Sequence, residues 1–176
     1  MQSTFQRLKQ VEAQCLESAK DMPSADGASD DWLGIGFSVA GTELLSRMGE
    51  VTEILDLPPY TKVPGVKPWV VGIANVRGGL LPLMDLRGFI TGQSMKNRNT
   101  GRVMVVDHNG LHTGLLVEEV HGMRHFSPNE QAYELPEISN QLKPYIKQAF
   151  NKDNTYWPVF SMHALVEDER FLQASL

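Results

Sequence analysis

The chain of 176 residues carries a net charge of −5 at neutral pH, and 41% of its residues are hydrophobic, which is sufficient for the core of one domain or of two small fused subdomains. The acidic balance, without a basic stripe, argues against a nucleic-acid binder. There is one cysteine, no secretion signal and no apolar run near the roughly twenty residues of a membrane span. We therefore expect a cytoplasmic protein without an internal disulfide, a metal site or a membrane-inserted segment.

Residues 1–31 are predicted to form an amphipathic helix followed by a flexible linker. Within residues 1–20, hydrophobic side chains recur at steps of three and four, which makes one apolar stripe of Phe5, Leu8, Val11, Cys15 and Leu16. Residues 21–31 are mostly small, polar and acidic and include Pro and Gly, a composition typical of linkers. Whether this helix docks on its own domain or on a partner stays open.

From residue 32 onward the sequence is typical of many short strands. Hydrophobic and small residues alternate with period two in residues 33–40, and dipeptides such as Asn109-Gly110 between apolar runs predict tight hairpins. The other turn signals are Ala40-Gly41, Gly78-Gly79 and the stretch 151–154. Further strands are expected at 44–54, with a bend at Gly49 as an open alternative, and at 73–77, 80–86, 103–107, 111–120, 123–126, 145–150 and 156–162.

Helices are expected at few places in this part of the chain. Pro68 can begin one helical turn, and residues 164–172 have helical spacing with acids near their start. Residues 91–101 and 136–144 are predicted to be loops. Together, the expected strands, turns and helices predict an all-β barrel or sandwich with a helix at each end of the chain. Because strands and helices do not alternate, a parallel nucleotide-binding sheet is not expected.

A search for catalytic chemistry finds no phosphate-binding loop and no nucleophile elbow. Histidines recur four residues apart at His108 and His112 and at His121 and His125, but glycine-containing turns interrupt both pairs, so structural or exposed roles are favoured over a metal site. Asp85 could act as a general base at the end of a strand, although such an acid more often accepts hydrogen bonds from backbone amides at a turn. We expect no catalytic site and no cofactor.

Residues 72–87, which read GIANVRGGLLPLMDLR, resemble the signature of CheW-like domains. In that signature a Gly-Val/Ile-x-Asn-Leu/Val-Arg-Gly strand and turn precede an apolar strand that ends in Asp-Leu-Arg. Three more segments match in register, namely VTEI at 51–54, PWVVG at 68–72 and GLLVEEV at 114–120. The resemblance covers residues 33–166. The added N-terminal helix, together with WPVFSM at 157–162, is similar to the PilI branch of the family.

This resemblance implies two packed five-stranded SH3-like barrels within a CheW-like domain over residues 32–172. It also implies a non-enzymatic adaptor that joins a CheA-type histidine kinase to the cytoplasmic tip of a methyl-accepting chemoreceptor. Such an adaptor is recruited to membrane receptor arrays through its partners. The PilI branch serves the chemosensory system that controls type IV pili and twitching motility. The alternative from another class is a small β-barrel that binds oligonucleotides.

The resemblance also nominates site residues. Arg77 and Glu53 match family positions that lie close together and support receptor and kinase coupling, although a purely structural ion pair is an open alternative. Val51, Val76 and Ile73 are candidates for either the core or the partner-binding surface. Four further residues are expected to shape turns: Asn75, Gly78, Gly79 and Asp85.

Overall fold

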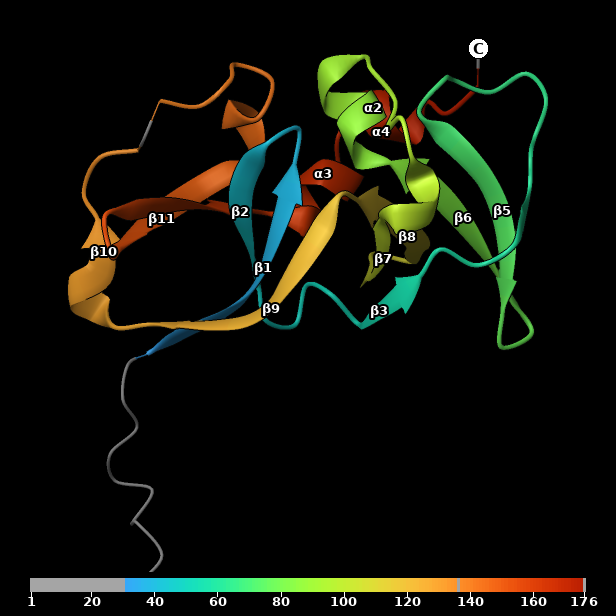
Figure 1. Cartoon of the computed structure of the whole chain (residues 1–176). Helices are drawn as coiled ribbons and strands as arrows, with labels where there is room; N and C mark the ends of the chain where they lie inside the picture. Colours follow the sequence, from blue (N-terminus) through green and yellow to red (C-terminus); the bar gives the residue numbers. More distant parts are fainter. Residues whose placement is uncertain (1–30, 136, 176) are drawn as a thin grey trace, which may run out of the picture. The chain divides into compact units, whose positions relative to one another are not determined.

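The computed structural model describes residues 31–135 and 137–175 (Figure 1). The helix predicted over residues 1–20 and the linker up to residue 30 lie outside the described residues. The described part belongs to one compact unit that begins at Asp31.

Strands dominate the described residues and form two sheets. The first sheet has the order β10-β11-β12-β2-β1-β9 and contains β1 (Trp32–Val39), β2 (Thr42–Arg47), β9 (Glu119–Phe126), β10 (Gln131–Ala132), β11 (Ile146–Lys152) and β12 (Thr155–Phe160). The second has the order β3-β7-β8-β6-β5-β4 and contains β3 (Glu53–Asp56), β4 (Tyr60–Thr61), β5 (Val70–Val76), β6 (Gly79–Asp85), β7 (Arg102–His108) and β8 (Leu111–Val117).

Short helices connect and flank the strands. These are α2 (Leu86–Thr91), α3 (Met162–Val166), α4 (Glu169–Leu172) and the single 3₁₀ turns η2 (Arg98–Thr100), η3 (Pro128–Glu130) and η4 (Lys143–Tyr145). The all-β class is therefore confirmed. Each sheet has five strands of four or more residues and one strand of two residues, β10 or β4, so the expectation of two five-stranded units is met apart from these short additions.

Four hairpins turn on two residues with left-handed backbone. Their central pairs are Ala40-Gly41, Arg77-Gly78, Asn109-Gly110 and Asp153-Asn154, all with φ between 51° and 84°. Positive φ at both positions matches the twist of the flanking strands, and it favours Gly, Asn and Asp. The sequence located two of these turns correctly. The turn expected at Gly78-Gly79 begins one residue earlier, and Asn151 and Lys152 belong to β11 rather than to its turn.

The chain builds the two sheets in an interrupted order. It forms β1 and β2, leaves to build the whole second sheet with β3 to β8, and returns with β9 to pair beside β1. Figure 1 shows this as blue and orange strands in one sheet and green to yellow strands in the other. Parallel pairing of β12 with β2 and of β6 with β8 completes the sheets. The first sheet therefore depends on residues from both ends of the described chain.

One hydrophobic cluster spans both sheets and joins them. It includes Phe37 and Phe160 from the first sheet and Met104 and Leu115 from the second, all fully buried. Burial of one such side chain stabilises the fold by about 1.5–3 kcal/mol. Smaller clusters lie within the second sheet, around Leu83, and within the first. Because the main core is shared, the two halves form one packed body.

The prediction of one strand over residues 44–54 is wrong, because the chain does not merely bend at Gly49 but changes sheet there. β2 ends at Arg47, Gly49 adopts a left-handed φ of 96°, and β3 begins at Glu53 in the other sheet. The strand predicted over 111–120 is likewise divided between β8 and β9, which lie in different sheets. Each break transfers the chain between the two halves of the fold.

The helical predictions also need correction. Pro68 and Trp69 form a single turn, closed by the Val70 amide that donates to the Lys67 carbonyl oxygen at 2.9 Å, and β5 begins at Val70 instead of a helical turn. The helix expected over residues 164–172 is two helices, because Asp168 leaves helical geometry and caps the second, α4. Helix α2 was not predicted: its six residues are too few to show helical periodicity.

Candidate partner-binding surface

The β5–β6 hairpin places an arginine at an exposed turn. Arg77 has φ 51° and Gly78 has φ 84°, and the backbone N–H of Gly78 donates to Asn75 Oδ1 at 3.0 Å. The Asn75 amide thus fixes the turn, and a side chain other than hydrogen at Gly78 would strain it. Gly79 already belongs to β6, and its φ lies outside the left-handed region.

Arg77 forms an ion pair with Glu53 on β3. In the second sheet β3 is the first strand and β5 the fifth, so this pair connects strands that are not hydrogen-bonded neighbours. The Arg77 side chain is 77% exposed and that of Glu53 is 28% exposed. A pair in such contact with water contributes about 0–1 kcal/mol to stability. The pair therefore shapes the surface more than it stabilises the fold.

An apolar groove of about 290 Å³ lies beside Glu53. It runs between the facing edges of the two sheets, where Figure 1 shows β9 next to β3. Three exposed hydrophobic side chains line it: Met48, Ile54 and Met123. Exposed fractions of 41–61% are high for such side chains, and clustered exposed apolar residues mark interaction sites. We call this the inter-sheet groove.

The structure brings some of the nominated residues together and separates others. Val51 and Glu53 line the inter-sheet groove, and Arg77 reaches its rim through Glu53. Ile73 and Val76 lie on β5 and do not line it; Val76 packs against the core cluster of the second sheet.

Sequence reasoning missed the most exposed hydrophobic residues of this surface. Met48, Ile54 and Met123 line the groove, and Leu80, which is 71% exposed, follows the Arg77 turn on β6. The available signal was weak: Met48 and Met123 are single hydrophobic residues among polar and glycine neighbours. Their common location depends on two strands that are far apart in sequence.

Asp85 lies in the interior rather than on this surface. It is fully buried and caps α2, with Oδ1 accepting from the Gly88 amide at 2.9 Å and Oδ2 from the Met95 amide at 2.9 Å. The guanidinium of Arg98 completes its partners at 3.3–3.4 Å. Both carboxylate oxygens accept hydrogen bonds from the protein itself, so Asp85 organises the segment from α2 to η2.

The histidines show no chelating arrangement. His108 and His163 stack at 3.8 Å, and His108 Nε2 lies 2.8 Å from Glu167, which joins the β7–β8 hairpin to α3. Among residues 31–135 and 137–175, no group of three His, Cys, Asp or Glu side chains is placed to hold a metal ion. Within the same residues, no helix is long and apolar enough to cross a bilayer.

Comparison with known proteins points to one family. The profile of the CheW-like domain matches residues 33–170. The chain is 42% identical over its full length to Protein PilI of Pseudomonas aeruginosa, covering 98% of that protein. It is 26% identical to the chemotaxis protein CheW of Bacillus subtilis over 77% of this chain and 86% of that one.

A solved structure shares the fold. The crystal structure of the scaffolding protein TtCheW from Thermoanaerobacter tengcongensis superposes with a TM-score of 0.66 at 22% identity, over 79% of this chain and 94% of that one.

Proposed function

Since the chain belongs to the CheW-like domain family, we propose that it is a non-enzymatic adaptor that couples a CheA-type histidine kinase to a methyl-accepting chemoreceptor. The observation that carries this proposal is the inter-sheet groove, an exposed apolar surface bordered by the Glu53–Arg77 ion pair. A pathway adaptor acts through such surfaces, where apolar contacts supply affinity and rim charges select the partner.

The groove suits an amphipathic helix. Met48, Ile54 and Met123 can accept the apolar face of a helix whose hydrophobic residues recur at three- and four-residue steps. Methionine side chains are flexible and adapt to such a face. We assign the groove to the cytoplasmic tip of the receptor, with Glu53 and Arg77 pairing with polar residues beside that tip. Val51 contributes to the groove, whereas Ile73 and Val76 support the hairpin.

The likeness to Protein PilI extends along the whole chain and supports a place in the PilI branch. The proposed output is therefore control of type IV pili and twitching motility. In this proposal residues 32–172 are the adaptor domain, residues 1–31 are an additional arm, and the protein is cytoplasmic and held at receptor arrays by its partners. The acidic charge disfavours the alternative, an oligonucleotide-binding barrel.

Titration calorimetry tests the coupling role. The full chain is titrated with the regulatory domain of the CheA-type kinase and, separately, with the receptor tip from the same organism. We expect saturable one-to-one binding of both, with dissociation constants on the order of micromolar. Failure of both partners to bind the folded protein would contradict the proposal.

A matched pair of variants locates the receptor site. Met123→Glu places a charge in the inter-sheet groove, and Leu135→Glu places the same charge at another exposed hydrophobic residue, beyond β10. Met123→Glu is expected to weaken receptor binding at least about tenfold, because burial of an unpaired charge is costly. Leu135→Glu should bind as the parent does. Equal binding by both variants would exclude the groove as the receptor site.

Deletion of the gene tests the output. Loss of twitching, restored by the parent chain and not by Met123→Glu, is expected. Normal twitching in the deletion strain would refute the assignment to pilus control. It would not affect the adaptor role, which the calorimetry tests separately.

A further inference from the structure

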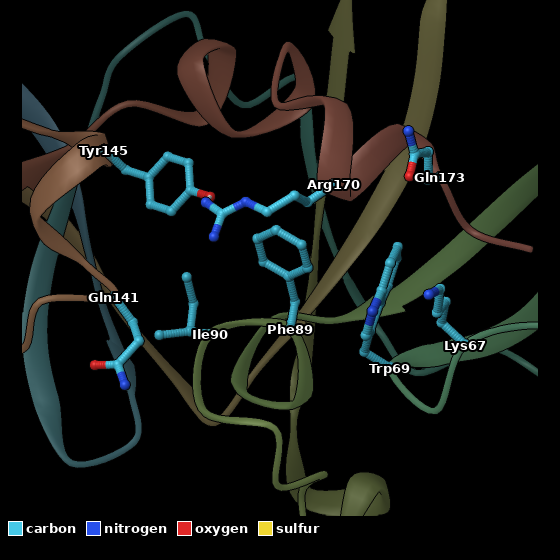
Figure 2. Close-up of a pocket in the computed structure, with 8 residues that line it drawn as sticks. All are labelled: Lys67, Trp69, Phe89, Ile90, Gln141, Tyr145, Arg170 and Gln173. Atoms are coloured by element: carbon cyan, nitrogen blue, oxygen red, sulfur yellow. Dashed lines mark hydrogen bonds between the residues drawn. The ribbon is translucent and has the colours of Figure 1, made fainter. Parts of the chain in front are cut away.

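A second hollow, of about 340 Å³, shares no lining residue with the inter-sheet groove. Its volume falls within the range of roughly 300–1,000 Å³ that is common for small-ligand pockets. Figure 2 shows its eight lining side chains, which come from four segments: the residues just before β5, helix α2, the region of η4, and helix α4 with the residue that follows. We call it the α2–α4 pocket.

Aromatic rings form one wall of this pocket. Trp69 stacks on Phe171 with ring centroids 5.5 Å apart, and Phe89 lies edge-on to both at 5.2 and 5.3 Å. Trp69 and Phe89 are both partly exposed and line the pocket, as Figure 2 shows. Rings held by one another in this way offer a rigid surface to a planar group.

A fixed arginine lies beside this wall. Arg170 makes a two-point contact with Asp168, at 3.1 Å from Nε and 2.7 Å from Nη2, and Nη2 also donates to the Tyr145 hydroxyl oxygen at 3.0 Å. The Tyr145 hydroxyl donates to Asp168 at 2.6 Å. Hydrogen bonds from Arg170 hold the pKa of Asp168 well below its usual range, and burial raises the pKa of Tyr145. The network therefore fixes the position of the Arg170 guanidinium, which lines the pocket and whose charge Asp168 balances.

One of the two cations that line the pocket has no carboxylate partner among the described residues, whereas Asp168 balances the charge of the other, Arg170. Lys67 lines it on the far side of Trp69 from Phe89, as Figure 2 shows, and no carboxylate of the described residues lies within 4.0 Å of its ammonium group. The other polar lining groups are the amides of Gln141 and Gln173. No acidic side chain lines the pocket, although the whole protein carries a net charge of −5. The Lys67 ammonium group, without an acidic neighbour in the lining, therefore favours an anion.

The walls are held in place from both halves of the fold. The Lys67 amide donates to the Ala174 carbonyl oxygen at 2.8 Å, and Val66 and Ser175 form a β-bridge, so the segment after α4 is fastened to the segment before β5. Tyr145 precedes β11 of the first sheet, and Phe89 follows β6 of the second. A ligand would meet a pocket that is already formed, which reduces the entropy lost on binding.

We propose that the α2–α4 pocket binds a small organic anion with a planar ring, such as an aromatic carboxylate or a nucleoside monophosphate. The ring packs against Trp69 and Phe89, and the carboxylate or phosphate interacts with the ammonium group of Lys67 beside Trp69. The two glutamine amides supply neutral hydrogen bonds to the remainder of the molecule. This role is independent of kinase and receptor binding.

Nuclear magnetic resonance of the ¹⁵N-labelled full chain tests the proposal. The protein has three tryptophans, and only Trp69 lines this pocket, so its indole N–H resonance reports on occupancy. The probes are adenosine 5′-monophosphate and 1-naphthoate, each compared with an uncharged analogue, adenosine or 1-naphthalenemethanol. At least one anion is expected to shift the Trp69 resonance saturably, with a dissociation constant between about 10 µM and 1 mM.

Charge variants decide whether the cationic rim is responsible. Lys67→Glu is expected to weaken binding at least about tenfold, which corresponds to roughly 1.4 kcal/mol. Lys62→Glu makes the same charge change at an exposed position that lines none of the described pockets and should leave binding unchanged. A Trp69 resonance unmoved by both anions at concentrations on the order of 10 mM would overturn the proposal. Equal binding of the uncharged analogues, or shifts confined to Trp32 or Trp157, would also overturn it.

Discussion

The two ends of strand β6 carry arginine–carboxylate sites with opposite characters. At its start, the turn presents Arg77 to Glu53 in contact with water. At its end, Asp85 is fully buried and receives two backbone amides as well as Arg98. Both sites involve the segment that carries the family signature. The contrast shows that one motif can combine a surface for partners with an anchor for the fold, and that burial distinguishes the two.

The largest expected effect is at the buried site. Asp85→Ala removes the cap of α2 and leaves the Met95 amide and the Arg98 guanidinium without their acceptor, so we expect a loss of about 3 kcal/mol or more in the free energy of unfolding. Urea denaturation measures it. The control is Asp56→Ala, which removes an exposed acid paired with Arg102 and should change stability by about 1 kcal/mol or less. Similar losses in the free energy of unfolding of both variants would contradict the conclusion that burial distinguishes the two sites.

Arg77→Glu should separate partner binding from folding. It replaces an attractive contact with Glu53 by a repulsive one, and because the site is exposed we expect stability to fall by no more than about 1 kcal/mol. Binding of the receptor tip should weaken at least about tenfold. Circular dichroism and calorimetry report the two quantities. A variant that is unfolded at room temperature would instead assign Arg77 to the fold.

The Asp168–Arg170 contact lies between these extremes, since the Asp168 side chain is 16% exposed and that of Arg170 is 70% exposed. The pKa of Asp168 is lowered in the folded protein, chiefly by hydrogen bonds from Arg170. The ionised form therefore stabilises the fold above the unfolded-state pKa of about 4, and this stabilisation is lost as the pH falls toward the lower folded-state value. The stability advantage of the parent over Asp168→Asn, about 1 kcal/mol at pH 7, should shrink below about pH 4. Urea denaturation at pH 7, 4 and 3 measures this difference in the free energy of unfolding. A difference that increased as the pH fell would contradict the lowered pKa of Asp168 in the folded protein.

The smallest effect is expected from exchanging the charges of the exposed pair. Glu53→Arg combined with Arg77→Glu restores the attraction, so the free energy of unfolding should return to within about 0.5 kcal/mol of the parent value. Partner binding should remain weak, because a partner would meet the charges in exchanged positions. Recovery of binding by the double variant would show that the pair acts only by bridging β3 and β5.

Local sequence patterns determined much of this molecule. Period-two alternation predicts β1, and left-handed dipeptides predict the hairpins at Ala40-Gly41 and Asn109-Gly110, because both signals depend on residues within a few positions of one another. The stretch 72–87 is specific enough to indicate the family. The acid at its end, Asp85, was recognised as a residue that accepts backbone hydrogen bonds, since short acids favour such turns.

Only the tertiary structure decided where the chain changes sheet and which residues share a surface. The breaks near Gly49 and between β8 and β9 follow from the shared core, which local propensity does not report. The inter-sheet groove combines Met48, Ile54 and Met123 from strands and connections up to 75 residues apart, and the α2–α4 pocket likewise joins segments from both sheets. A sequence specifies contacts between near neighbours directly, whereas a surface made by distant segments exists only after the core has brought them together.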